Sequence, residues 1–276
     1  MANSNIVKLQ GYFNNENVMK NLRAMLGQKA QGFATSVLSV VNNNRLLQNS
    51  DPASIYSSAM VAASLDLPIN PNLGFAAIVP YGKVSQFQIM TRGLIQLAIR
   101  SGQYEKITNA PVHKGELVKC DPFRDEYAFD ASKRESDEVI GYMAYFRTVG
   151  GFEKYLYMSK DEVLAHGKRY SKSFNSGPWK DNTEAMCLKT VLKLLLSKYG
   201  ILSIEMQRAI KFDQGVVRED LTMMESIEDI DAVEVDYADN PNGMPTETVE
   251  EEVDPSKGLF GDDNVIKEDK KDGTKK

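Results

Sequence analysis

Apolar residues recur at helical spacing through the N-terminal part of the chain. The pattern predicts helices over 16–26 and 33–41, and a third helix that begins at Asp51-Pro52. An aspartate at the N-cap accepts hydrogen bonds from free N–H groups of the first turn, and proline suits the first helical position. Residues 1–15 are rich in Asn and are expected to form a flexible or oligomer-dependent arm.

The hydrophobic period changes twice between residues 65 and 106. Two apolar-rich segments, Phe75–Val79 and Val84–Met90, flank the turn Pro80-Tyr81-Gly82-Lys83 and predict a β-hairpin. The spacing then becomes helical again and stops at Gly102. One face of that helix carries three polar side chains four residues apart: Arg92, Gln96 and Arg100.

A second hairpin is predicted from Tyr142–Thr148 and Phe152–Met158, which Gly150-Gly151 joins. Its many aromatic residues have two readings, since they either pack in a core or stack on nucleic-acid bases. A loop over 168–180 leads to a helix from about Asn182 to Tyr199. Opposite its broad Leu-rich surface, that helix carries Lys189 and Lys193.

These elements predict an α+β fold in which a helical layer packs on a small antiparallel sheet made of hairpins. One compact domain is expected over residues 16–212, after the N-terminal arm. From 213 to 276 the chain is acidic and poor in large aromatic residues, and we expect most of it to be disordered, with a possible docking element around Leu259-Phe260.

Charge is divided unevenly along the 276 residues. Residues 213–276 hold 20 Asp and Glu against 7 Lys and Arg, whereas residues 1–212 hold 18 against 26, so a net −5 conceals a body of +8 and a tail of −13. A basic body is typical of proteins that bind phosphate, although a solvated lysine-rich surface has the same composition. No apolar run or signal sequence indicates a membrane protein, so a cytoplasmic location is expected.

Residues for catalysis are sparse. His113 and His166 are the two histidines and have no metal-ligand spacing, Cys120 and Cys187 belong to no CxxC pair, and no phosphate-binding GxxxxGK[ST] loop occurs. The acidic cluster formed by Asp121 and its neighbours lacks the partner that a metal-dependent nuclease needs. We therefore expect no enzyme activity, no cofactor and no metal.

Residues for binding single-stranded nucleic acid are more plentiful, because such binding needs cations along a groove and planar groups that accept any base. The first group is Tyr81, Lys83, Arg92, Gln96, Arg100 and Lys106. The second group is Lys168, Arg169, Lys172, Phe174, Trp179, Lys180, Lys189 and Lys193. Each group keeps an alternative interpretation. The stripe of Arg92, Gln96 and Arg100 in the first group is then a plain exposed helix face, and Trp179 in the second group is a buried anchor that holds its loop against the following helix.

Three ordered blocks carry a resemblance to a known family. They read LPINPNLGFAAIVPYGK, then GLIQLAIRSG, then GPWKD followed by EAMCLKT, and together they resemble the RecT family of phage and prophage single-strand annealing proteins. The resemblance covers roughly residues 20–212, and the stretch from Leu117 to Asp130 matches loosely.

The resemblance implies ATP-independent binding of single-stranded DNA and annealing of complementary strands in phage-type recombination. It also implies a ring or helical filament of identical subunits with the N-terminal helices at the subunit interface, and a basic groove in which Arg92, Arg100, Lys189 and Lys193 contact phosphates. A phage exonuclease and, through the C-terminal region, the host single-strand-binding protein are the implied partners. The alternatives are a passive single-strand-protecting protein, a nuclease and a scaffold. Truncation after Phe212 is expected to preserve or strengthen DNA binding, because it removes a net −13, and to lose contact with the host factor.

Overall fold

The N-terminal helices form a bundle around one central helix. The computed structural model describes residues 4–171, 174–175, 177–217, 221, 230 and 235–237, all of which lie in a compact unit from Met1 to Met244. The helices of the bundle are α1 (Ser4–Phe13), α2 (Glu16–Leu26), α3 (Ala30–Asn42), α4 (Arg45–Gln48) and α5 (Pro52–Ser64). Almost all of α5 is buried, because its small Ala and Ser side chains let its neighbours approach closely. As predicted, Asp51 caps α5 by accepting from the Ser54 N–H at 3.2 Å.

The expectation of a flexible arm over residues 1–15 is wrong for the described residues. Residues 4–13 form α1, in which Leu9 is fully buried and Phe13 is 5% exposed. The Phe13 ring meets Tyr56 of α5 edge-on, with 5.9 Å between centroids. Leu9 and Phe13 are four residues apart and so share one helix face, a signal that the Asn-rich composition concealed.

The first predicted hairpin and the helix after it are confirmed. Strands β1 (Ala76–Tyr81) and β2 (Val84–Ile89) pair antiparallel, and α6 (Thr91–Arg100) follows them. A Cβ atom at Gly93 would lie 2.1 Å from the Phe75 carbonyl oxygen, so the close approach of α6 to the hairpin requires glycine at that position.

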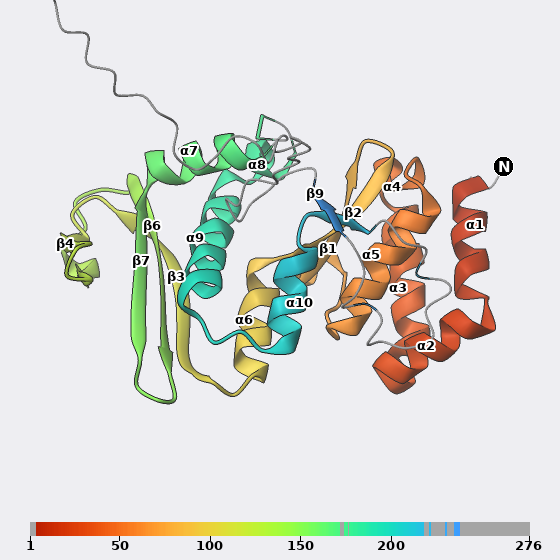
Figure 1. The fold of residues 1–276 in the computed structure, drawn as a ribbon. Coiled ribbons are helices and arrows are strands. Elements are labelled where there is room, and N and C mark those ends of the chain that lie inside the picture. The colour runs from red at the N-terminus through yellow and green to blue at the C-terminus, as the bar shows by residue number, and fades with distance from the viewer. Residues whose placement is uncertain are drawn as a thin grey trace, which may run out of the picture. The chain divides into compact units, whose positions relative to one another are not determined.

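The second hairpin is also confirmed and belongs to a larger sheet. Its order is β3 (Tyr104–His113), β6 (Val139–Thr148) and β7 (Glu153–Ser159). Helices α7 (Lys160–Tyr170) and α9 (Thr183–Tyr199) contact this sheet and lie on one side of it (Figure 1). A capping box of Ser159 and Glu162 begins α7.

The aromatic residues of β6 and β7 divide between the two faces of this sheet. Tyr142 and Phe146 are buried in the core. The rings of Tyr145 and Tyr155 are less buried and contact each other at a tilt, with 4.4 Å between centroids. A further hairpin, made of β4 (Leu117–Asp121) and β5 (Glu126–Phe129), packs its rings against Tyr155.

The packed domain continues past residue 212, so the predicted boundary there is wrong. Helices α8 (Pro178–Asp181) and α10 (Ile204–Phe212) precede strand β8 (Gly215–Val217), which pairs with β9 (Val235–Tyr237). Asp213, between α10 and β8, is fully buried, so a truncation after Phe212 removes part of the core. The predicted disorder farther along the tail concerns residues outside those described. The predicted α+β class, with small antiparallel sheets, is confirmed.

Candidate nucleic-acid interface

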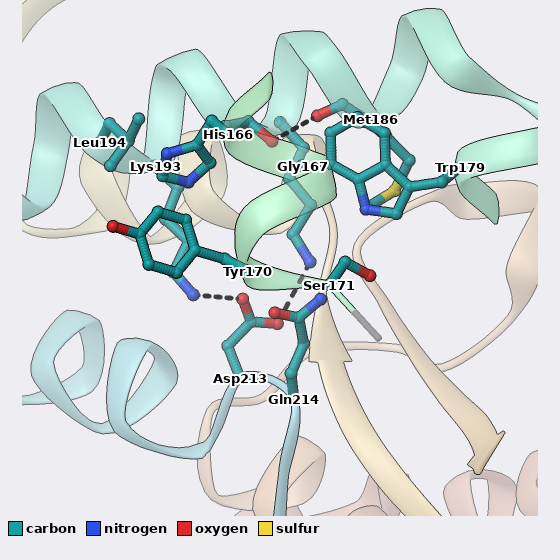
Figure 2. A pocket seen from close by; sticks show the side chains of 12 residues that line it. His166, Gly167, Tyr170, Ser171, Trp179, Met186, Lys193, Leu194, Asp213 and Gln214 are labelled. Atoms are coloured by element: carbon teal, nitrogen blue, oxygen red, sulfur yellow. Dashed lines mark hydrogen bonds and ion pairs between the residues drawn. The ribbon is translucent and has the colours of Figure 1, made fainter. Parts of the chain in front are cut away.

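Two lysines of α9 converge on one buried carboxylate. Lys189 Nζ lies 3.2 Å from Asp213 Oδ1, and Lys193 Nζ lies 2.6 Å from Asp213 Oδ2 (Figure 2). The Ile89 N–H of β2 also donates to Asp213 Oδ1 at 3.0 Å. Asp213 therefore links α9 to the first hairpin, and we call these three charged side chains the buried triad.

The buried triad is almost completely removed from water. Lys189 is 4% exposed and Lys193 5% exposed, and Asp213 is not exposed at all. Burial lowers the pKa of Lys189, because a charged ammonium is poorly solvated there. Burial alone would raise the pKa of Asp213, but the two adjacent ammonium groups lower it below its ordinary value.

The expectation that Lys189 and Lys193 are exposed and contact phosphates in a basic groove is therefore wrong, because both side chains are buried. Both ammonium groups already bond a carboxylate inside the protein, and a phosphate cannot reach them without displacing Asp213. The sequence itself indicates this burial, because Leu or Val occupies most positions next to the two lysines in α9.

A small pocket of about 30 Å³ lies beside the buried triad. Trp179 of α8 lines it and is only 6% exposed. A Cβ atom at Gly167 of α7 would lie 2.5 Å from the indole, so α7 and α8 pack in direct contact. The ring of Phe174 also packs against the indole, at 5.3 Å between centroids. Of the two readings of Trp179, the buried anchor matches this arrangement.

The arginines of the α6 stripe bond the loop over residues 65–75. Arg92 Nη1 donates to the Leu73 carbonyl at 3.1 Å. Arg100 donates to the carbonyls of Leu65 and Asp66, each at 2.6 Å. Carbonyls at the end of a helix lack partners within the helix, so Arg100 stabilises the C-terminus of α5.

The third residue of the stripe, Gln96, faces a groove of about 650 Å³ between α3, the 65–75 loop and α6. We call it the α3–α6 groove. Its apolar lining consists of Leu26, Phe33, Leu67, Pro68, Ile69, Leu73 and Phe75. Lys29, Asp66 and Arg100 supply its charges, and Lys29 Nζ pairs with Asp66 Oδ2 at 3.0 Å. This groove is a formed cavity that the sequence did not reveal.

Four predicted cations are exposed on elements at the upper side of the domain as drawn in Figure 1. The β1–β2 turn, the C-terminal end of α7 and α8 all lie along the upper side of Figure 1. We call their exposed residues the cationic edge: Lys83, Lys168, Arg169 and Lys180. The turn is held in place because its Lys83 carbonyl accepts from the Asp51 N–H at 2.7 Å. Tyr81, at the end of β1, is half-buried.

One further predicted cation lies on the three-stranded sheet. Lys106 is exposed on β3, where it is paired in register with Arg147 of β6. Lys172 is outside the described residues. The structure therefore divides the predicted site into a cationic edge, a groove beside α6 and a buried triad.

Carboxylates and histidines in the described residues form no group of three or more that could hold a metal ion. Asp125 pairs with Lys154 and Glu126 with Lys119, so the acidic cluster near Asp121 is engaged in separate ion pairs. In the same part of the chain, no helix has both the length and the apolar character needed to cross a membrane.

Comparisons with known proteins agree with the sequence blocks. A model of the RecT family matches residues 31–234. The uncharacterized protein YqaK of Bacillus subtilis (strain 168) is 46% identical over 252 residues, which cover 91% of this chain and 86% of that protein. Protein RecT of Escherichia coli (strain K12) is 30% identical over 177 residues, which cover 61% of this chain and 65% of that protein.

Proposed function

This chain belongs to the RecT family of single-strand annealing recombination proteins, and we propose that it anneals complementary DNA strands without ATP while holding them along the cationic edge. The observation that carries this proposal is the exposure of Lys83, Lys168, Arg169 and Lys180 on elements along the upper side of Figure 1, in a chain with a net charge of +8 over residues 1–212. Exposed ammonium and guanidinium groups bind phosphates and release counterions.

Annealing needs no covalent chemistry by the protein. Two DNA strands repel each other through their phosphates, and cations on a protein surface reduce that repulsion while the strands search for their register. Watson–Crick pairing then selects the sequence, and the protein contacts the backbone. In this proposal the buried triad has a structural role, because it fixes α9 and the first hairpin beneath the edge.

One subunit offers few phosphate contacts, so binding of a long strand requires many subunits side by side. We propose a ring or filament of identical chains, since several weak sites on one strand act together at high effective concentration. Single-stranded DNA, the nascent duplex and an exonuclease that produces the single strands are its proposed partners in a bacterial cytoplasm. A host single-strand-binding protein is the proposed partner of the acidic C-terminal region.

An annealing time course tests the proposal. Two complementary oligonucleotides, one carrying a fluorophore and the other a quencher, are mixed with and without the protein and without nucleotide cofactor. The proposal predicts faster quenching with the protein. A passive single-strand-protecting protein would bind the same oligonucleotides and slow the quenching, and that result would contradict the proposal.

A further inference from the structure

One large apolar side chain in the described structure is almost fully exposed. Phe123 lies at the turn between β4 and β5 and is 99% exposed. The turn has a defined conformation, because Asp121 Oδ1 accepts from the Phe123 and Arg124 N–H groups, both at 3.1 Å. Asp125 has a φ of 59° and pairs with Lys154 of β7 at 2.6 Å. The ring is thus presented to solvent by an ordered turn.

The hairpin that carries this turn is anchored on the sheet. Its Phe129 ring lies 5.9 Å from Tyr155 and 6.2 Å from Tyr157 of β7, and Tyr127 lies 6.3 Å from Tyr155. Such ring pairs stabilise their contact beyond the area that they bury. The hairpin therefore holds the backbone at Phe123 in place, which favours binding because the backbone loses little conformational freedom.

The α3–α6 groove has the chemistry to receive an aromatic side chain. Its lining is mainly apolar, and its volume of about 650 Å³ falls within the roughly 300–1,000 Å³ typical of ligand-binding cavities. The groove cannot receive Phe123 of the same chain, because the β4–β5 hairpin and the N-terminal helices lie at opposite ends of the domain (Figure 1).

Charge does not oppose this pairing. The six residues of the turn read DPFRDE, a net −2, and the ion pairs of Asp125 with Lys154 and of Glu126 with Lys119 bring the local balance to zero. The groove is lined by Lys29, Arg100 and Asp66, for a net +1. The two surfaces therefore do not carry like net charges.

We infer that Phe123 of one chain inserts into the α3–α6 groove of a second copy of this chain. The contact joins two different surfaces, so a pair of copies still has one free turn and one free groove, and repetition yields a ring or an open filament. This inference rests on the self-assembly that the proposed function requires, and it names the surfaces involved.

Two complementary defects test this contact. Phe123→Glu places a charge on the turn and leaves the groove intact, whereas Leu73→Glu places a charge in the groove and leaves the turn intact. Leu73 is 40% exposed, so the second change is compatible with the fold. Ser36→Trp, at an exposed groove position on α3, is a second groove variant should Leu73→Glu fail to fold. Val149→Glu, at a 68% exposed apolar residue in the β6–β7 turn, is the matched control.

Masses are measured by light scattering and sedimentation, with and without two complementary oligonucleotides added in succession. We expect large assemblies for the wild-type protein and for Val149→Glu, and self-association at least tenfold weaker for each turn or groove variant. A mixture of Phe123→Glu with Leu73→Glu should stop at dimers, because one productive contact remains possible between them.

Any of three results overturns the inference: Phe123→Glu assembles like the wild type, the mixture stays monomeric, or the wild type itself never assembles. If a groove variant fails to assemble while Phe123→Glu assembles, the groove holds a different segment and the inference is wrong. Annealing measured on the same samples separates the two proposals, because assembly through Phe123 without faster pairing contradicts the proposed function alone.

Discussion

The buried triad and the cationic edge use the same kinds of side chain for opposite purposes. Lys189 and Lys193 lie inside the protein on Asp213, whereas Lys83, Lys168 and their neighbours on the edge extend into solvent. A cation in water can exchange its solvent shell for a phosphate at small cost. A buried cation must keep its partner, because an unpaired charge in the interior is strongly destabilising.

The difference shows that a lysine or arginine in the sequence can bind a phosphate only where the fold leaves its side chain exposed. Of the cations in the two groups predicted from the sequence, five exposed residues remain candidates for phosphate contact: Lys83, Lys106, Lys168, Arg169 and Lys180. The α6 arginines are intermediate, since they are exposed in part but bond carbonyls of the 65–75 loop.

The largest effect is expected for Asp213→Asn. The change leaves two buried ammonium groups without a counter-charge, and loss of one partner in a buried ion pair typically costs about 3–5 kcal/mol. Chemical denaturation should show a drop of that size in the free energy of unfolding. Asp137→Asn is the control, because the Asp137 side chain is 98% exposed and its ion pair with Arg134 contributes at most about 1 kcal/mol. A loss as small as that of the control would show that the triad does not hold the fold.

The stability gap between the wild type and Asp213→Asn should also depend on pH. The pKa of Asp213 in the folded protein lies below 3.8, its ordinary value, so its stabilising effect is fully present above that value and is lost as pH falls through the folded-state pKa. Denaturation at a series of pH values should therefore show a constant gap near neutrality that closes only below pH 3.8. A gap that closes near pH 5 would mean that the carboxylate is not held by the two lysines.

Much of the fold follows from local sequence signals. Pro and Gly at the turns, alternation in the strands and the Asp51-Pro52 helix start are all properties of near neighbours, and the structure confirms the elements that they predict. The β4–β5 hairpin was not predicted, since the resemblance is loose there and its strands are short. Helix α1 does not follow from composition, because the Asn-rich segment conceals the four-residue spacing of Leu9 and Phe13.

The division of the candidate site could not be predicted in the same way. Asp213 meets lysines that are 24 and 20 residues away in the chain and an N–H group that is 124 residues away. No local pattern specifies such contacts, which depend on how α9, α10 and the first hairpin pack together. The exposed lysines are predictable from local sequence, because a turn or a helix end is enough to place a side chain at the surface.

Salt dependence of DNA binding tests the central claim most directly. The affinity for a short single-stranded oligonucleotide is measured across salt concentrations for the wild type and for two triple variants. The edge variant is Lys83→Gln/Lys168→Gln/Lys180→Gln. The control variant is Lys8→Gln/Lys20→Gln/Arg23→Gln, which changes three exposed cations of α1 and α2. Each phosphate contact contributes about 0.7 to the slope of log affinity against log salt, so the edge variant should flatten the slope by about 2. The control should keep the wild-type slope. Equal slopes for the edge variant and the wild type would contradict the assignment of the cationic edge to DNA.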